Sequence, residues 1–165
     1  MTSIIIRHAH DDNPYYKHSH DKKITSLGKS LAYKLGDKLV NKYGYPDIIF
    51  CSPFTRTIQT TKKIKKSIDK KIKIIIDNRL SRYFTHKEKK HPDVYTKTIK
   101  KDIPIYETYD EFKKRCDSFI NDINYYKKKK YNIWIITHVL VLKRITKKFR
   151  IKIHKHIDYL EYYKL

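Results

Sequence analysis

Short apolar runs alternate with helix-like stretches along the chain, and this alternation limits the folds open to it. The runs that are rich enough in β-branched residues for strands are 3–6, 47–51, 72–76 and 132–137. Strands that alternate with helices favour a largely parallel sheet with helices on both faces. We therefore expect a single domain over residues 1–165, a three-layer α/β/α sandwich. The segment 158–165 is expected to add a last strand at the edge of the sheet, where an antiparallel strand fits.

Capping residues and apolar stripes mark the first two expected helices. One begins after Thr25. The next opens with Ser52 as its N-cap and Pro53 at its first helical position, where these residue types are favoured. The stripes expected to face the core are Leu27, Leu31, Leu35 and Leu39 in the first helix, and Phe54, Ile58, Ile64 and Ile68 in the second.

The second half of the chain contains one long segment without a clean period, residues 77–107. We expect an irregular insertion there, and loops of that length are usually functional. Thr108 and Glu111 then have the capping-box spacing, and 139–149 is expected to form a last helix. The stripe expected in the helix after Thr108 is Phe112, Cys116, Phe119 and Ile123.

Positive charge is the strongest compositional bias, with 39 Lys and Arg against 17 Asp and Glu and a formal net charge of +22. Such a charge attracts nucleic-acid phosphates. However, Lys, Ile and Tyr are abundant while Gly (3) and Trp (1) are scarce, as an AT-rich coding sequence would give. No basic patch is interleaved with aromatic residues in the way that stacking platforms require. We favour the compositional explanation, and nucleic acid stays a secondary candidate partner.

Other features indicate where the protein works. No apolar run is long enough to span a membrane, and the stretch 4–6 is too short for the core of a signal peptide. We expect no membrane partner. Two cysteines, Cys51 and Cys116, make no disulfide framework and indicate a reducing environment. The expected location is the cytoplasm.

Cationic and imidazole side chains follow the expected strands, whose carboxyl ends meet at one edge of the sheet. The first strand is followed by Arg7 and His8, the fourth by His138, and the helix after the second strand carries Arg56 in its first turn. Helix N-termini favour anions, and the planar guanidinium matches phosphate oxygens. An imidazole held among cations stays neutral more readily and can attack phosphorus. The sequence therefore predicts a phosphoryl-binding crevice.

Four motifs resemble, in order, those of the histidine phosphatase superfamily, phosphoglycerate-mutase-like branch. They are IIIRHAHDD, KKITSLGKSLAYKLGDKL, IIFCSPFTRTIQTTKKI and IWIITHVLVLKRI, similar to the family's R-H-G, L-T-x-x-G, S-P-x-x-R-x-x-Q-T and S-H-G. The resemblance extends over nearly the whole chain.

The resemblance implies a role for each matching residue. His8 would be the nucleophile and form a covalent phosphohistidine, Arg7 and Arg56 would hold the phosphoryl oxygens, and His138 would stabilise the transferring group. Val139 replaces the glycine of the last motif, but its backbone N–H remains available to the phosphoryl group. No metal and no cofactor is implied.

One position departs from the family in a way that bears on chemistry. Many members place an acidic residue two positions after the leucine of DNRLSRYF, as the acid that protonates the leaving group, and here that position is Arg82. A guanidinium stays charged at neutral pH and cannot donate a proton. Glu88, Asp93 or His10 could replace the acid, or none is present. Arg82 could also bind a second acidic group on the substrate.

The expected activity is therefore hydrolysis of a phosphomonoester or phosphohistidine, on a small molecule or a phosphoprotein. Without an acid, aryl phosphates and phosphohistidine should react faster than alkyl phosphates, because a phenolate leaves more easily than an alkoxide. The chain is short for a sugar-phosphate mutase. We therefore expect a phosphatase, with a phosphoglycerate-mutase-type phosphotransferase as the alternative.

Two further alternatives come from other classes of protein. The fold could serve as a non-catalytic phosphate-binding module, with turnover lost through Arg82. A zinc site is the other, since closely spaced histidine pairs suit that metal on an extended segment. The pairs are His8 with His10, His18 with His20, and His154 with His156.

Overall fold

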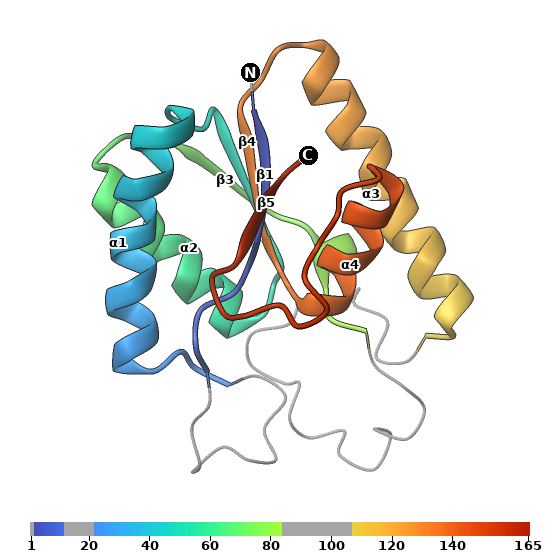
Figure 1. Ribbon diagram of the computed structural model, residues 1–165, viewed down its shortest axis with the longest axis horizontal. Helices are drawn as coiled ribbons and strands as arrows, with labels where there is room; N and C mark the ends of the chain where they lie inside the picture. Colours follow the sequence, from blue (N-terminus) through green and yellow to red (C-terminus); the bar gives the residue numbers. More distant parts are fainter. Residues whose placement is uncertain (1, 12–21, 84–106) are drawn as a thin grey trace.

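The structure is a computed structural model that describes residues 2–11, 22–83 and 107–165. Five strands form one sheet in the order β3-β2-β4-β1-β5 (Figure 1). The strands are β1 (Ser3–Arg7), β2 (Ile48–Cys51), β3 (Lys73–Ile76), β4 (Ile133–Thr137) and β5 (Tyr162–Lys164). The first four are mutually parallel, while β5 pairs antiparallel with β1 at the edge. The predicted sheet and its antiparallel edge strand are confirmed.

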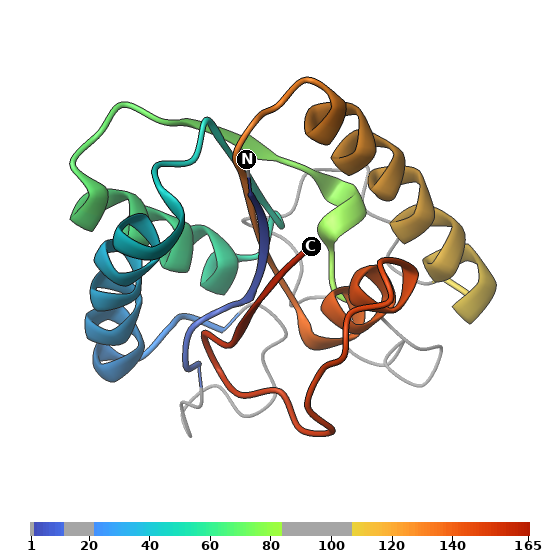
Figure 2. The same cartoon turned by 45° about the horizontal axis from the view of Figure 1, so that its top comes forward.

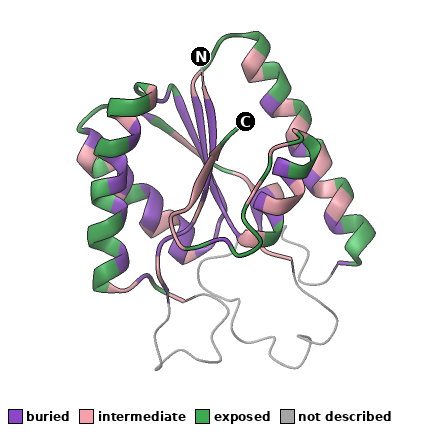
Figure 3. Ribbon diagram, in the orientation of Figure 1, coloured by how far each residue is buried: buried purple, intermediate pink, exposed green. Residues whose placement is uncertain are grey.

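Helices cover both faces of this sheet, which gives three layers (Figure 2). One face carries α1 (Ser26–Tyr43) and α2 (Thr55–Ile68), and the other carries α3 (Tyr109–Lys128) and α4 (Val139–Lys148). Side chains alternate along a strand, so Ile4 and Ile6 of β1 pack toward α1 and α2, while Ile5 packs toward α3 and α4. The central strands are buried except at Arg7, the last residue of β1, which is half-buried (Figure 3). Within the described residues, none of the helices combines the length and hydropathy needed to cross a bilayer.

The apolar stripe predicted for α1 is wrong in its first half. Leu27 and Leu31 are 59% and 42% exposed. A spacing of four residues drifts around a helix that has 3.6 residues per turn, so four leucines cannot all face the core. The buried positions are Gly28, Ala32, Leu35, Gly36 and Leu39. Small residues on this face let α1 approach α2 closely, since a Cβ on Gly36 would lie 2.7 Å from the Ile64 carbonyl oxygen.

The predicted start of α2 is also wrong. The helix begins at Thr55 and not at Pro53, and Ser52 does not cap it. Its buried face is formed by threonines as well as isoleucines, and Ile58 is only half-buried. The threonine hydroxyls can be buried because each donates to a backbone carbonyl of the preceding turn, as Thr61 does to Thr57 at 2.9 Å.

The remaining helix predictions agree with the structure. Thr25 caps α1 by accepting from the Gly28 N–H at 3.0 Å, and the capping box between Thr108 and Glu111 opens α3. The predicted stripe of α3 is buried at all of its positions. Of the long insertion, the structure describes a short 3₁₀ turn at Asn78–Leu80 and the residues up to Tyr83; Glu88, Asp93 and the pair His18–His20 lie outside the described residues.

Candidate active site

A cavity of about 330 Å³ lies at the carboxyl edge of the sheet, where β1 and β4 end and α2 and α4 begin. It is lined by Arg7, His8, Asp11, Lys22, Arg56, Arg82, Tyr83, His138, Val139 and Leu140. The structure thus brings together the four side chains that the sequence predicted for a phosphoryl site, together with Val139. Their roles in catalysis stay predictions.

His8 is held in one tautomer by its neighbours. Its Nδ1 lies 2.9 Å from the backbone oxygen of Ala9, which only accepts, so Nδ1 carries the proton. Its Nε2 accepts a hydrogen bond from Arg56 Nε at 3.2 Å. Burial lowers the pKa of His8 well below its usual value, and the positive charge of Arg56 lowers it further. The ring is therefore neutral, with its Nε2 lone pair directed at the guanidinium that would hold a phosphoryl group.

Arg56 connects the two imidazoles of the site. Besides its bond to His8, it donates from Nη2 to His138 Nδ1 at 3.2 Å. The two rings lie edge to face with their centroids 5.3 Å apart. Burial also lowers the pKa of His138 well below the usual value, again with Arg56 as the second cause. Burial, helped by the charge of one shared guanidinium, thus keeps both imidazoles neutral.

Ser52 fixes the other side of His138. Because His138 Nδ1 accepts from Arg56, its proton resides on Nε2, which lies 2.9 Å from Ser52 Oγ and donates to it. Phe54 packs against the same ring edge to face at 4.9 Å. The serine that sequence reasoning assigned to helix capping therefore positions an imidazole instead.

Arg7 is positioned by the C-terminal segment that precedes β5. Its Nη1 donates to the Ile157 carbonyl oxygen, and its guanidinium lies over the Tyr159 ring at 3.9 Å. Its Nε is buried without a hydrogen-bond acceptor among the described residues. A buried donor without an acceptor is costly, and an anion oxygen in the cavity would supply one.

Asp11 is a residue of the site that sequence reasoning missed. One carboxylate oxygen lies 3.4 Å from Arg56 Nε, and the other accepts a hydrogen bond from the Tyr159 hydroxyl at 2.9 Å. The signal in the sequence was the acidic pair that ends the first motif. Tyr159 was expected in a strand over 158–165, but the strand is only Tyr162–Lys164 and Tyr159 lies in the irregular segment before it. The carboxylate partly neutralises the guanidinium that would bind phosphate, so the two anions compete for Arg56.

The mouth of the cavity has a cationic part and an apolar part. Arg82 and Lys22 are half-buried in its wall, beside Tyr83. Val139 and Leu140 open α4 there, and His138 makes no side-chain cap to that helix. The first N–H groups of a helix lack intrahelical partners, which makes this end of α4 a second source of donors for an anion.

His10 does not line the cavity. Its Nδ1 lies 3.0 Å from Thr25 Oγ1, and its backbone oxygen accepts from the Thr25 N–H at 2.9 Å. A Cβ on Gly28 would lie 2.5 Å from that same oxygen, so glycine is needed for this close approach. His10 ties the segment after β1 to α1, a structural task that competes with acid catalysis.

Metal ligation gains no support from the described part of the chain, where no group of three or more His, Cys, Asp or Glu side chains is placed to hold an ion. His154 pairs with Glu161 at 2.8 Å, and His156 with Asp158 at 3.3 Å.

Solved structures similar to this chain include several phosphatases, all at low identity. The ecdysone phosphate phosphatase of Bombix mori in complex with tungstate matches with a TM-score of 0.68 and 17% identity, over 96% of this chain and 82% of its own. The phosphoserine phosphatase of Entamoeba histolytica in complex with 3-phosphoglyceric acid gives 0.65 and 20%, over 99% and 89%. The protein histidine phosphatase SixA with tungstate gives 0.60 and 14%, over 88% and 75%. At this identity the likeness shows the fold.

No curated protein matches the chain in the sequence comparison. The family model for the histidine phosphatase superfamily (branch 1), however, matches residues 3–161. This range contains all four motifs and every described residue that lines the cavity. The chain therefore belongs to the histidine phosphatase superfamily, branch 1.

Proposed function

We propose that this protein is a metal-independent phosphatase that hydrolyses a phosphomonoester or phosphohistidine through a covalent phosphohistidine on His8. The observation that carries the proposal is the neutral His8 ring, whose Nε2 has no proton and faces Arg56 at 3.2 Å. A nucleophile needs a lone pair at the pH of the reaction, and a phosphoryl group needs buried cations.

In the first step His8 Nε2 attacks phosphorus, and the bond from phosphorus to the leaving atom breaks. The bonding electrons depart with the leaving group, which takes a proton from solvent. Arg7 and Arg56 hold the remaining phosphoryl oxygens, and the Nε group of Arg7 gains the acceptor that it otherwise lacks. The bound dianion favours the uptake of one proton from solvent by His138, which then donates from Nδ1 in place of accepting from Arg56. Two cations and one new imidazolium stabilise the charge that develops in the transition state.

In the second step water attacks the phosphorus of phospho-His8. The bond to Nε2 breaks, the lone pair returns to the ring, and inorganic phosphate leaves. Throughout, the Ala9 carbonyl keeps the proton on Nδ1, so the ring stays oriented with Nε2 toward the substrate. No other group has to accept the proton of His8, because the attacking nitrogen has none.

The two cysteines are poor rivals for the role of nucleophile. Burial raises the pKa of the Cys51 thiol to about 11 and that of Cys116 to about 12, and the thiolate is the reactive form. Both are buried and neither forms a disulfide, which fits the cytoplasmic location expected from the sequence.

The test is His8→Ala with p-nitrophenyl phosphate, measured with and without EDTA. We expect kcat/KM to fall by at least about 10⁴-fold, while the circular dichroism spectrum stays unchanged and EDTA has no effect. His154→Ala, at an exposed position, is the matched control and keeps full activity. Turnover by a folded His8→Ala protein would overturn the mechanism.

Arg82 favours one second candidate, the non-catalytic phosphate-binding module, because a guanidinium stands where many family members carry their acid. Both candidates predict vanadate binding at Arg7 and Arg56. They differ in the covalent intermediate, which mass spectrometry of the intact protein at alkaline pH would detect on His8 only if the protein is an enzyme.

A further inference from the structure

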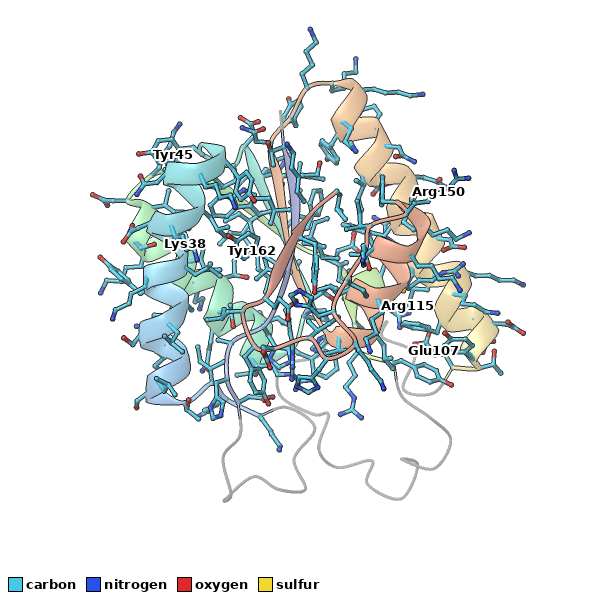
Figure 4. All side chains as sticks on the ribbon, in the orientation of Figure 1. Lys38, Tyr45, Glu107, Arg115, Arg150 and Tyr162 are labelled. Atoms are coloured by element: carbon cyan, nitrogen blue, oxygen red, sulfur yellow. The ribbon has the colours of Figure 1, made fainter. Side chains whose placement is uncertain are left out.

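A second cavity lies at the carboxyl end of α4, away from the active site. Its volume is about 670 Å³, and the segment that follows the helix forms its other wall. Arg150, at the turn between the helix and this segment, marks the place in Figure 4. Five cations line this α4 groove, and its described lining contains no carboxylate. The cations are Lys143, Lys147, Arg150, Lys152 and Lys155.

The cations of α4 divide between two sides of the helix. Arg144 and Lys148 both pair with Asp117 of α3, at 2.5 and 3.2 Å. Lys143 and Lys147, each one position earlier, line the groove, and no groove cation has an acidic partner among the described residues. Like charges four residues apart on a helix repel each other. The groove therefore concentrates positive charge that the described part of the chain does not neutralise.

The shape of the α4 groove is fixed by backbone hydrogen bonds. The N–H groups of Arg150 and Ile151 donate to carbonyl oxygens in the last turns of α4 at 3.1 and 3.0 Å. Arg150 has a φ of 55°, and the chain reverses direction there. Lys143 Nζ donates to the backbone oxygen of Lys155 at 3.4 Å, which joins the two walls. Ile153 packs against the core. The groove is therefore formed before any partner binds.

The lining indicates the chemistry of the partner. Ile151 and Ile153 lie half-buried among the cations. Single-stranded nucleic acids stack their bases on aromatic rings, and the only ring in the described lining is the imidazole of His154, which already pairs with Glu161 at 2.8 Å. Cations interleaved with aliphatic side chains suit a peptide segment that carries carboxylates beside aliphatic residues.

One face of α4 connects the groove to the active site. Leu140 lines the active-site cavity and is 45% exposed, while Lys143 and Lys147 line the groove. Residues with this spacing lie on one side of a helix. The rise from Leu140 to Lys147 is about 10 Å, which about three residues of extended chain cover. One polypeptide can therefore place a phosphorylated side chain in the cavity and a neighbouring segment in the groove.

We propose that the α4 groove binds an acidic segment of a phosphoprotein substrate, a few residues from the phosphorylated side chain. Carboxylates of the segment pair with the exposed Lys147 and Lys152, and its aliphatic side chains pack on Ile151 and Ile153. That the bound protein is a substrate rests on the proposed function, whereas the binding of an acidic segment does not. Abundant lysine alone would attract such a segment equally to other basic surfaces.

Binding of an unphosphorylated peptide tests the groove without turnover. The probe is a short fluorescein-labelled peptide in which glutamates surround two leucines, and its control has glutamine in place of every glutamate. Fluorescence anisotropy at low ionic strength should give a Kd at least about tenfold lower for the glutamate peptide, because several exposed charge pairs contribute. Replacing the leucines by serines should raise the Kd about threefold or more, since partial burial of leucine is lost.

Substitutions locate the binding site. Lys147→Met together with Lys152→Met should raise the Kd of the glutamate peptide about threefold to tenfold. The matched control is Lys62→Met together with Lys66→Met, which removes two exposed charges from a basic groove beside α2, on the opposite face of the sheet. Both variants have the same net charge, but the control should keep the Kd within about twofold. Equal weakening in the two variants would overturn the assignment to the α4 groove.

A single-stranded oligothymidylate of the same charge tests the other class of polyanion. It should bind more weakly than the glutamate peptide and should respond equally to the two double variants. Tighter binding that is lost only in the Lys147→Met/Lys152→Met protein would overturn the peptide assignment in favour of nucleic acid.

Turnover separates the groove from the proposed function. A phosphotyrosine peptide that carries the acidic segment about three residues away should have a kcat/KM on the order of tenfold above its glutamine counterpart. Lys147→Met/Lys152→Met should remove most of that advantage and leave turnover of p-nitrophenyl phosphate unchanged. Equal kcat/KM for the two phosphopeptides would overturn the role of the groove in substrate binding. Absent turnover of every substrate, with the Kd difference intact, would refute the phosphatase proposal and leave the acidic-segment site standing.

Discussion

The two buried imidazoles make the stability of the protein depend on pH in a narrow window. Burial, and then the charge of Arg56, lower the pKa of His8 and His138 well below 6.5. The unfolded chain has ordinary histidines, so below pH 6.5 it binds protons that the folded state does not. The contribution of these two rings to the free energy of unfolding is then fully present above pH 6.5. It is lost as the pH falls toward the pKa values of the folded state.

The size of the effect follows from the same linkage. At pH 5.5 an imidazole with a pKa of about 6.5 is roughly 90% protonated in the unfolded chain, which costs the folded state about 1.4 kcal/mol per buried neutral ring. The pair should therefore lower the free energy of unfolding by up to about 2.7 kcal/mol between pH 7.5 and 5.5. Carboxylates change the free energy of unfolding only at lower pH. In Asp117 the hydrogen bonds from Arg144 and Lys148 outweigh burial and lower the pKa below 3.8.

Urea unfolding at the two pH values, in the absence of phosphate, measures this difference. His8→Gln/His138→Gln should lose most of it, whatever its absolute stability, while His156→Gln, with a side chain that is 85% exposed, should keep it. The rest of the chain responds to pH in the same way in all three proteins. A flat stability profile in the unmodified protein, or an undiminished difference in the double variant, would refute the assignment of buried neutral rings.

Three other predictions concern the site and its scaffold. Arg56→Ala should weaken vanadate inhibition by roughly 100-fold, since two charge-assisted hydrogen bonds are lost; unchanged inhibition would count against Arg56 as a phosphoryl ligand. The rate for aryl phosphates should depend steeply on leaving-group pKa, and Arg82→Glu should make that dependence shallower by supplying an acid; a shallow slope in the unmodified protein would show that an acid is present already. Gly28→Ala should destabilise the fold by about 1–3 kcal/mol in urea unfolding, because its Cβ would meet the His10 carbonyl oxygen at 2.5 Å; equal stability would mean that the segment after β1 yields easily.

The residues that sequence reasoning found share one property, namely their place at the end of a regular element. Arg7 ends β1 and His8 follows it, His138 follows β4, and Arg56 lies in the first turn of α2. Because parallel strands end at one edge, adjacency in space follows from the strand pattern alone. The strand pattern therefore predicts the crevice without any side-chain geometry.

The residues that sequence reasoning missed are placed by parts of the chain that have no helix or strand periodicity. Tyr159 lies in an irregular segment before β5, and only the fold brings its hydroxyl to Asp11. Ser52 matched a capping pattern, but the helix starts later, which releases the hydroxyl for His138. The α1 stripe failed in its first half because a spacing of four residues drifts around the helix, so Gly28 and Ala32 take the buried positions in place of Leu27 and Leu31.

The position of β1 in the sheet has a consequence for biosynthesis. Strand β1 lies between β4 and β5, so both of its neighbours are synthesised more than 120 residues after it. Until then the backbone N–H and C=O groups along both edges of β1 have no strand partner. Strand pairing over such a long sequence separation forms slowly. His8 stays remote from His138 during that interval, and Arg7 lacks the Tyr159 ring beneath it. A nascent chain stalled before β4 would expose the isoleucines of β1 to chaperones and would have no phosphoryl site.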